Sequence, residues 1–460
     1  MGRLQAMVVS VRRRARWARF AGVARALRRP AVMALAPMTA DAFCSRAGGM
    51  PVASAAALVA GRIGAPRCFL VPTPPPVADH ARIMEPDGTL HPPLDNAALG
   101  FSRTRQAYLR MRGGLVSPTT GLVMPEFGTV LQKDSTRWLP EHRLLPGFVD
   151  ITDDGLFVRE DALQPAVQIS RTVLVLCHAF HRNYGHWLFD CLPWLLPWLD
   201  HLRSGRLAVL VPPLRGHWQR RTLELLQVPA SAVIEAPAES LLCTDMIVPV
   251  TLMPPAKRQR PQEQLPRSIA VMTSEASASH ALPKADIEVV ETVAALRAAA
   301  GAVAHVKRPE RIYVSRRGLE SFRTLQNEHD VESAVVRLGF TILRPQDYSF
   351  DEQVALFSHA RVIVGAHGAG LTNAVFAPPG CLVADILTDA WNTTWVLRMT
   401  QLFHHYYLPL MYPSDPEQSR PVMLGDVEIY QTRIFRVPVE EFASALEKAM
   451  RSLGLDRSAA

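Results

Sequence analysis

The chain has 460 residues, of which 48% are hydrophobic and 20% charged, and its formal net charge is +8. This length exceeds what one hydrophobic core supports, so we expect two main domains, and the composition excludes an intrinsically disordered protein. The six cysteines form no C-x-x-C pair, which fits neither a dense disulfide framework nor a cysteine zinc site. We therefore expect reduced thiols in a cytoplasmic protein.

Arginines dominate the start of the chain, where nine of them precede the first acidic residue, Asp41. They alternate with Trp17, Phe20 and Leu27, a pattern that fits a basic amphipathic helix on an anionic membrane surface or, equally, a solvated tail. We interpret residues 1–61 as a basic arm, with peripheral membrane contact as one prediction. No signal peptide or transmembrane span is expected, and no nucleic-acid recognition fold accompanies the arginines.

The next part of the chain changes character at residue 171. Before it, proline-rich punctuation separates short β-prone pieces such as 69–71 and 156–158, which predicts an irregular segment. Beyond it, we expect strands at 173–177, 207–211, 232–235 and 246–250 and helices at 183–199 and 215–226. This alternation favours a parallel sheet, so we interpret 62–275 as an N-terminal segment with a first Rossmann-like domain. The stretch 254–279 is typical of an interdomain linker.

The second half alternates more regularly. We expect strands at 312–315, 340–343, 362–364 and 382–387 and helices at 331–338, 350–359 and 371–376. This pattern predicts a doubly wound α/β domain over 276–437. Residues 438–460 form a C-terminal helix and tail, and we expect the helix at 439–453 to pack against the first domain.

A glycine-rich segment is the most informative part of the sequence. In R-V-I-V-G-A-H-G-A-G-L-T-N-A-V-F-A-P-P-G, residues 361–380, a buried strand runs into a turn and a helix start. Gly365, Gly368 and Gly370 permit tight turning, and the free N–H groups of the following helix attract an anion such as a diphosphate. The spacing is neither the dinucleotide fingerprint nor a P-loop. A plain strand-to-helix connection is the alternative.

Arginines follow the first strand of the same domain. Y-V-S-R-R at 313–317 ends in Arg316 and Arg317, and Arg323 and Asn327 come soon after. Because the carboxyl ends of parallel strands line ligand crevices, these side chains and the glycine turn should face one crevice. Guanidinium groups there can neutralise a leaving diphosphate, as a metal ion does in many enzymes. Solvated surface arginines are the alternative.

In the first half, N-Y-G-H-W-L-F-D at 183–190 opens a helix directly after a strand. His186 and Asp190 are four residues apart, which puts both side chains on one helix face. A histidine held by a carboxylate is a candidate general base for removing a hydroxyl proton. A helix-start charge beside a satisfied core histidine is the alternative.

Together these segments resemble glycosyltransferase family 61, which includes protein O-linked N-acetylglucosaminyltransferases, plant arabinoxylan transferases and bacterial polysaccharide glycosyltransferases. The matching stretches are N-Y-G-H-W-L-F-D-C-L-P at 183–193, Y-V-S-R-R at 313–317 with Arg323, Asn327 and Glu328, G-F-T-I-L-R-P at 339–345, and E-Q-V-A-L-F-S-H-A-R-V-I-V-G-A-H-G-A-G-L-T-N at 352–373. The resemblance spans residues 174–387 and does not cover the first 150 residues.

The resemblance implies a GT-B fold, which is two Rossmann-like domains with a cleft between them. It also implies inverting, metal-independent transfer of a sugar from a nucleotide-sugar donor to a glycan or lipid-linked glycan acceptor, as in bacterial capsule or lipopolysaccharide synthesis, without a cofactor. The absence of a D-x-D triplet agrees with metal independence. The implied donor-site residues are Arg316, Arg317, Arg323, Asn327, His367, Gly368, Ala369, Gly370, Leu371, Thr372, Asn373 and Asp385. The implied acceptor-side residues are Asn183, Tyr184 and Trp187.

In the expected reaction, Asp190 or His186 removes the acceptor proton while the arginines and the helix start stabilise the departing nucleoside diphosphate. Two other functions stay open, because a fold does not dictate a function. One is a nucleotide-sugar epimerase of the same architecture, which needs no acceptor. The other is a non-catalytic glycan-binding assembly subunit.

Overall fold

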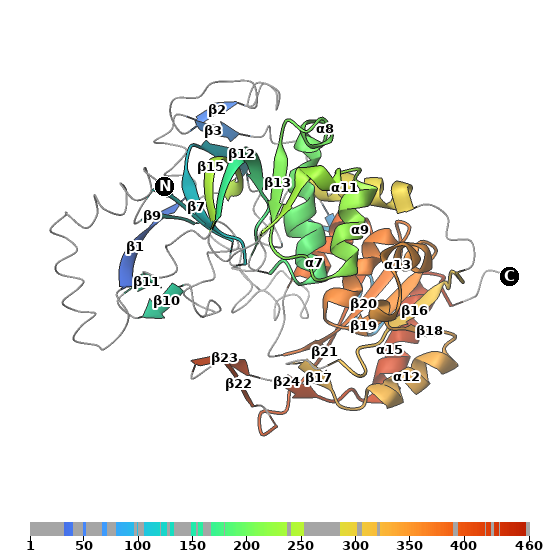
Figure 1. Cartoon of the computed structure of the whole chain (residues 1–460). Helices are drawn as coiled ribbons and strands as arrows, with labels where there is room; N and C mark the ends of the chain where they lie inside the picture. Colours follow the sequence, from blue (N-terminus) through green and yellow to red (C-terminus); the bar gives the residue numbers. More distant parts are fainter. Residues whose placement is uncertain are drawn as a thin grey trace.

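The computed structural model shows two halves, each built on a β-sheet with helices packed against it (Figure 1). The structure describes residues 32–39, 49–51, 67–70, 80–95, 99, 105–119, 121–126, 129–132, 149–152, 155–159, 167–178, 180–236, 241–252, 286–300, 306–319, 323–389, 394–418, 420–424, 427–431 and 433–456. The arginines at 3–29 and the predicted linker at 254–279 lie outside these ranges, so what we expect of them stays a prediction.

Within the described residues, the first sheet contains thirteen strands. They are β1 (Val32–Thr39), β2 (Gly49–Pro51), β3 (Arg67–Leu70), β6 (Arg105–Met111), β7 (Gly114–Ser117), β8 (Leu122–Glu126), β9 (Thr129–Gln132), β10 (Val149–Thr152), β11 (Gly155–Arg159), β12 (Val167–Val175), β13 (Ala208–Val211), β14 (Val233–Glu235) and β15 (Leu241–Leu252). Strands β15, β12, β13 and β14 lie in that order and are parallel. Strands β6 and β7 pair with β15 in antiparallel fashion.

The helical segment after β12 changes type along its length. It passes through α7 (Tyr184–His186), the π-helical turn η2 (Trp187–Cys191), the 3-10 helix η3 (Leu192–Trp198) and α8 (Leu199–Arg203); α9 (His217–Leu225) and η4 (Ala230–Ala232) follow β13. Pro193 and Pro197 lack the backbone donors that a continuous α-helix needs, which explains why the predicted helix at 183–199 tightens there. Single π turns of this kind are frequent at functional sites.

The second sheet has seven strands in the described part of the chain. In spatial order they are β18 (Thr341–Leu343), β16 (Arg311–Val314), β19 (Val362–Ala366), β20 (Leu382–Thr388), β21 (Tyr406–Tyr412), β4 (His80–Ile83) and β5 (Leu94–Asp95). All neighbours except β4 and β5 are parallel. Two small sheets join β17 (Arg323–Leu325) to β24 (Arg433–Phe435) and β22 (Pro421–Leu424) to β23 (Val427–Gln431).

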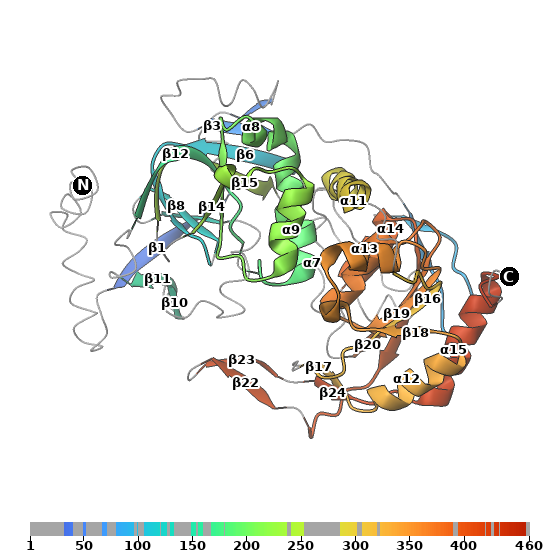
Figure 2. The same cartoon turned by 45° about the vertical axis from the view of Figure 1, so that its right-hand side comes forward.

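Helices cover both faces of the second sheet, which is why β19 and β20 are buried along their whole length. They are α11 (Asp286–Ala300), α12 (Glu328–Arg337), η7 (Pro345–Asp347), α13 (Phe350–Phe357), the 3-10 helix η8 (Ala369–Phe376), α14 (Trp395–Leu402) and α15 (Val439–Ser452). Apolar side chains of α12 and α15 pack on one face, and those of α13, η8 and α14 pack on the other. Figure 2 shows α12 and α15 side by side at the outer edge.

The two halves meet along helices. Helix α9 of the first half contacts α13 of the second, α7 contacts η8, and α11 lies against η3, α9 and α13 (Figures 1 and 2). The Arg221 guanidinium on α9 binds the Asp351 carboxylate on α13 through two hydrogen bonds of 2.7 and 3.0 Å. One continuous cluster of buried apolar side chains runs through both halves. The α7–η8 contact matters most for function. Helix α7 carries His186, and η8 follows the glycine turn, so the contact joins the two predicted parts of the site.

Several predictions can now be judged. The α/β class is confirmed, and the strands predicted in both parallel sheets are present. The docking of the terminal helix was predicted wrongly, because α15 packs on the second sheet beside α12 through Phe442 and Leu446. Strand β1 lies within the range assigned to the basic arm, and β4 lies within the first-domain range yet extends the second sheet. In the described residues, no helix is both long and apolar enough to cross a membrane.

Candidate functional site

One side of the site follows β12, at the carboxyl edge of the first parallel sheet. The chain turns through His178 and enters α7 at Asn183, whose side-chain oxygen accepts hydrogen bonds from the backbone N–H groups of Gly185 (2.9 Å) and His186 (3.3 Å). Such a cap satisfies two of the free donors that every helix start presents. Asn183 therefore holds the helix start on which His186 sits, as a structural residue.

His186 and Asp190 are paired, as their spacing predicts. Nδ1 of His186 lies 2.5 Å from Oδ2 of Asp190. The Asp190 side chain is 4% exposed, whereas that of His186 is 39% exposed, so the carboxylate is enclosed and the imidazole faces outward. The ring of Phe180 stacks on His186 with centroids 5.0 Å apart. The imidazole is thus fixed by the carboxylate on one edge and by an aromatic face.

A second histidine approaches the same carboxylate, and the sequence patterns did not single it out. Nε2 of His178 lies 3.7 Å from Oδ2 of Asp190, and its side chain is 11% exposed. The rings of His178 and His186 stack with centroids 5.6 Å apart. Its position directly after a buried strand was the available signal, because side chains at strand ends line ligand crevices.

Two imidazoles and a carboxylate this close invite a test for a metal. Within the part of the chain that the structure describes, His178, His186 and Asp190 form the one group of three whose ligand atoms lie close enough, all within 4.8 Å. A metal-bound histidine, however, normally donates its other ring N–H to a neighbour. Nδ1 of His178 instead accepts the backbone N–H of Phe180 at 3.1 Å, which assigns the ring proton to Nε2. The proton position on His178 therefore fits a metal site poorly.

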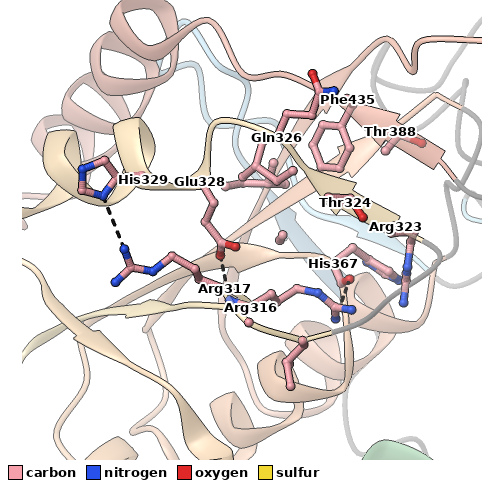
Figure 3. A pocket seen from close by; sticks show the side chains of 15 residues that line it. Arg316, Arg317, Arg323, Thr324, Gln326, Glu328, His329, His367, Thr388 and Phe435 are labelled. Atoms are coloured by element: carbon pink, nitrogen blue, oxygen red, sulfur yellow. Dashed lines mark hydrogen bonds between the residues drawn. The ribbon is translucent and has the colours of Figure 1, made fainter. Parts of the chain in front are cut away.

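The other side of the site is a pocket of about 260 Å³ at the carboxyl edge of the second sheet. Its walls come from the chain after β16, from β17, from the ends of β19 and β20, and from β24. Three arginines line it: Arg316, Arg317 and Arg323. Figure 3 shows Arg316 and Arg323 beside His367, with Phe435, Gln326 and Thr388 on the opposite wall. The pocket thus has a cationic floor and a largely uncharged roof.

Arg316 is fixed at the floor by its neighbours. Its guanidinium donates to the carbonyl of His367 at 3.4 Å, and its backbone N–H donates to the Glu328 carboxylate at 2.7 Å. A Cβ atom on Gly368 would lie 1.8 Å from Nη1 of Arg316, so glycine is needed there for the guanidinium to lie across the turn. Burial lowers the pKa of Arg316 and raises that of Glu328. Gly368 therefore leaves the space that the Arg316 guanidinium occupies.

Arg317 and Thr388 give the pocket two further polar features. Arg317 points away from Arg316, towards His329 at 3.4 Å and the Glu332 carboxylate at 3.3 Å (Figure 3). Thr388 is 2% exposed, and its hydroxyl has no hydrogen-bond partner among the described residues. A buried hydroxyl without a partner costs free energy, so a pocket ligand that bonds to it gains that energy back. The sequence patterns point to Arg317 but not to Thr388.

His367, which lines the pocket, and the buried Asp385 form a second histidine–aspartate pair. Nδ1 of His367 lies 2.9 Å from Oδ2 of Asp385, and the hydroxyl of Tyr407 donates to the same oxygen at 3.2 Å. The indole N–H of Trp395 donates to Nε2 of His367 at 2.8 Å. Burial lowers the pKa of His367, although Asp385 opposes the shift, so the ring is neutral with its proton on Nδ1. Both ring nitrogens are thus engaged within the protein.

The two sides are joined through α7 and η8. The Tyr184 hydroxyl donates to Oδ1 of Asn373 at 2.7 Å, and the Asn373 amide donates to Oε1 of Gln353 at 3.0 Å. A Cβ atom on Gly185 would lie 2.9 Å from Oγ1 of Thr372, so α7 rests directly on η8. This contact fixes the distance between the His186–Asp190 pair and the turn that carries Gly368.

The structure separates the predicted residues by location. Of the predicted donor-site residues, four line the pocket: Arg316, Arg317, Arg323 and His367. The others that lie behind the wall or between the halves are Asn327, Leu371, Thr372, Asn373 and Asp385. Ala369 and Gly370 are the first residues of η8 and are half-buried.

Three of the predicted binding residues have structural partners instead. Asn327 is held by the backbone of Val437 through hydrogen bonds of 2.8 and 3.0 Å, and Asp385 is fully buried. On the predicted acceptor side, Trp187 is fully buried and donates to the Thr222 hydroxyl at 2.9 Å. Asp385 and Trp187 have no exposed surface in this structure and Asn327 is 8% exposed, so their contacts with a substrate stay predictions.

Comparisons with known proteins cover this part of the chain. Residues 184–384, from the start of α7 to the middle of β20, match the family model described as glycosyltransferase 61. A relative from Oryza sativa subsp. japonica, the β-1,2-xylosyltransferase XAX1, is 34% identical over an alignment of 159 residues, and the match covers 27% of this chain. The match spans 27% of that relative's own length.

Residues 184–384, which carry most of the site, are therefore similar to a glycosyltransferase domain. The matching family, glycosyltransferase 61, is the one that the sequence resemblance predicted. The matched segment contains His186, Asp190, Arg316 and His367, so the family signal coincides with the geometry described above. Strand β4 and the terminal helix α15 lie outside it.

Proposed function

We propose that this chain transfers a sugar from a nucleotide-sugar donor to a hydroxyl of a glycan or lipid-linked glycan acceptor. The observation that supports it most is the pocket with Arg316, Arg317 and Arg323, which is joined through η8 and α7 to a half-exposed His186 on Asp190. One side suits a diphosphate leaving group, and the other suits removal of a proton. In this proposal the two halves act as the two domains of a GT-B fold.

Of the two candidates for the general base, His186 and Asp190, we propose His186. Oδ2 of Asp190 is enclosed and already faces two imidazoles, so it has no room for a sugar hydroxyl. With its Nδ1 proton held by Asp190, His186 presents Nε2 with a free lone pair to the outside. Asp190 then orients the ring and stabilises the imidazolium that forms, as in other histidine–carboxylate pairs.

The proposed step is a single displacement that inverts the anomeric carbon. The acceptor hydroxyl gives its proton to Nε2 of His186, and its oxygen forms a bond to the anomeric carbon from the face opposite the diphosphate. The bond between that carbon and the diphosphate oxygen breaks, and the electron pair leaves with the nucleoside diphosphate. Arg316 and Arg323 neutralise the charge that develops, so we propose that no divalent metal or cofactor is required.

The substrates and setting are part of the proposal. The relative from rice is named for xylosyl transfer, so a nucleoside diphosphate xylose belongs among the first donors to test. We keep bacterial polysaccharide synthesis as the proposed context and a cytoplasmic position at the membrane surface as the proposed location. The arginine-rich start of the chain supports that location through its charge.

The test is a panel of nucleotide sugars followed by a transfer assay. A donor that binds only the folded chain raises its free energy of unfolding, by about 2.7 kcal/mol when the donor concentration is 100 times its Kd. A thermal-shift assay detects this as a higher melting temperature. We expect stabilisation by one donor class, release of nucleoside diphosphate only with an acceptor present, and full activity in excess chelator. Isomerised donor without an acceptor would establish the epimerase alternative, and loss of activity in chelator would refute metal independence.

A further inference from the structure

His178 has no place in the reaction as proposed, yet it is built into the site. It lies at the carboxyl end of β12, whereas Asp190 lies on η2, so the contact joins the sheet to the helical segment. The side chain is largely buried and stacks on His186. A histidine placed only for packing would not need a ring nitrogen directed at a carboxylate.

The direction of the His178 ring is set by the backbone. The N–H of Phe180 donates to Nδ1 of His178, so the neutral ring carries its proton on Nε2, the nitrogen that faces Oδ2 of Asp190. The same Oδ2 accepts from Nδ1 of His186. Oδ2 therefore lies between two imidazole N–H groups, one from the sheet side and one from α7.

We propose that His178 is a positioning residue for the transfer reaction, which keeps Oδ2 of Asp190 directed at Nδ1 of His186. A carboxylate that could rotate about its side-chain torsion would release the His186 ring, and Nε2 would lose its aim at the acceptor. Contact with the N–H of His178 favours one rotation and, because the ring is held by Phe180, does so without a flexible side chain. The proposal rests on the proposed function of His186 as the base.

The same geometry predicts a specific pH effect. In the described part of the chain, the titratable side chains within 4 Å of the Asp190 carboxylate include His178, after β12, and His186, on α7. If the N–H of His178 is removed, the full negative charge of Oδ2 acts on His186 alone, which favours its protonated form. A base that stays protonated is inactive, so the acid limb of the kcat/KM profile should move to higher pH.

The experiment compares three replacements of His178. In His178→Gln the side-chain amide nitrogen reaches the place of Nε2, in His178→Asn it reaches only the place of Nδ1, and in His178→Ala there is no donor. We expect kcat to fall about 10- to 100-fold in Ala and Asn with both KM values unchanged, which is the loss that a misplaced group produces. Gln should recover most of the activity and the original pH profile.

A matched control comes from the same turn. His181 is also buried, but its Nδ1 lies 2.9 Å from the backbone carbonyl of His178 and not from the Asp190 carboxylate. His181→Ala therefore disturbs the turn without removing the N–H that faces Oδ2, and we expect an unchanged pH profile. The Gln–Asn comparison keeps the test valid if the Ala variant fails to fold.

Two results would overturn the proposal. One is a Gln variant no better than the Asn variant, with the wild-type pH profile in both. The other is a visible absorption spectrum of bound Co²⁺ that His178→Ala abolishes, which would assign the three residues to a metal. A third measurement is an NMR titration of the ring protons of His186 in the wild type and in His178→Ala. It needs no substrate, so it tests the effect of His178 on the His186–Asp190 pair even if no sugar transfer is found.

Discussion

The chain carries two histidine–aspartate pairs, and the contrast between them separates proton chemistry from architecture. In the first, His186 is half-exposed, and only its Nδ1 is engaged by Asp190. In the second, His367 is 3% exposed, with Nδ1 on Asp385 and Nε2 accepting from Trp395. Residue types and distances are similar, so a search for paired side chains would rank the two alike.

The difference teaches that the second ring nitrogen decides the role. A base needs a lone pair that a substrate can reach, and His186 has one on Nε2. In His367, Nε2 already accepts a hydrogen bond from the indole N–H of Trp395. The buried pair instead holds the end of β19, where the turn with Gly368 begins, and so supports the floor of the arginine pocket. The predictions below test this division of roles, starting with the largest effect.

The largest expected difference between the two histidine–aspartate pairs appears when each aspartate is replaced by asparagine. Asp190→Asn removes the charge that stabilises the His186 imidazolium, and we expect kcat to fall by about 10²- to 10⁴-fold. Asp385→Asn leaves a donor of His367 or Tyr407 without a good acceptor, so we expect the free energy of unfolding to fall by about 1–3 kcal/mol.

Steady-state kinetics and chemical denaturation of both variants check this pair. Activity per folded molecule should stay within about tenfold of wild type in Asp385→Asn, because no proton moves through it. An Asp190→Asn variant that keeps wild-type turnover would remove Asp190 from the reaction, and an equally inactive Asp385→Asn would end the distinction between the pairs.

The second prediction concerns the clearance over the glycine turn. In Gly368→Ala the new methyl group would occupy the space of Nη1 of Arg316, and the guanidinium, being the end of a flexible side chain, must move. We expect the donor KM to rise about 10-fold, since a charge-assisted contact contributes about 1.5–3 kcal/mol and is lost only in part. Stability and the acceptor KM should hardly change.

A double-mutant cycle provides the control for the glycine. Arg316→Ala should itself weaken donor binding, by about 10- to 100-fold, and Gly368→Ala should then add nothing further. Isothermal titration with the donor product, a nucleoside diphosphate, measures both variants without catalysis. Additive effects would show that Gly368 contributes through its backbone and not by making room for Arg316.

The smallest expected effect is the pH dependence of stability. Burial lowers the pKa of His367, and it lowers the pKa of His405 to about 4, both below the ordinary value of about 6.5 in an unfolded chain. The unfolded chain therefore binds more protons in acid, so the stabilisation is complete above about pH 6.5 and is lost as the pH falls below it.

Urea denaturation between pH 8 and pH 5 measures this loss. Each such histidine contributes a slope of up to about 1.4 kcal/mol per pH unit below that point. His405→Gln, which can still donate to the carbonyl of Ala374, should flatten the slope without moving the acid limb of kcat/KM. A slope that stays unchanged in this variant would show that His405 is not buried as a neutral ring.

The sequence predicted local features well and partners poorly. Apolar runs such as 362–366 predicted the strands, and the glycine turn after this run predicted the sheet edge where the arginines lie. Both are possible because periodicity and turn chemistry are local properties. The amphipathic pattern of α15 shows that one face is buried, but it does not show against which sheet. The pairing of β4 with β21 joins residues more than 300 positions apart, and no local pattern encodes it.

For the site, the sequence supplied residue types but could not assign their surroundings. Asp385, Asn327 and Trp187 have the chemistry of binding residues, and only the three-dimensional contacts show that they are enclosed. His178 and Thr388 were not predicted, because neither a lone histidine after a strand nor a lone threonine at the end of one forms part of a motif. Spacing identified the His186–Asp190 pair because both residues lie on one helical turn.

The position of β4 has a consequence for how the molecule is made. Strand β21 would be an open edge of the second sheet without β4, and open edges invite pairing with other molecules. Because β4 precedes the parallel strands β12, β13, β14 and β15 of the first sheet in the chain, a ribosome releases it long before its neighbour β21 exists. The early segment must wait for the late one, and a second half produced without residues 80–95 would expose the β21 edge to aggregation.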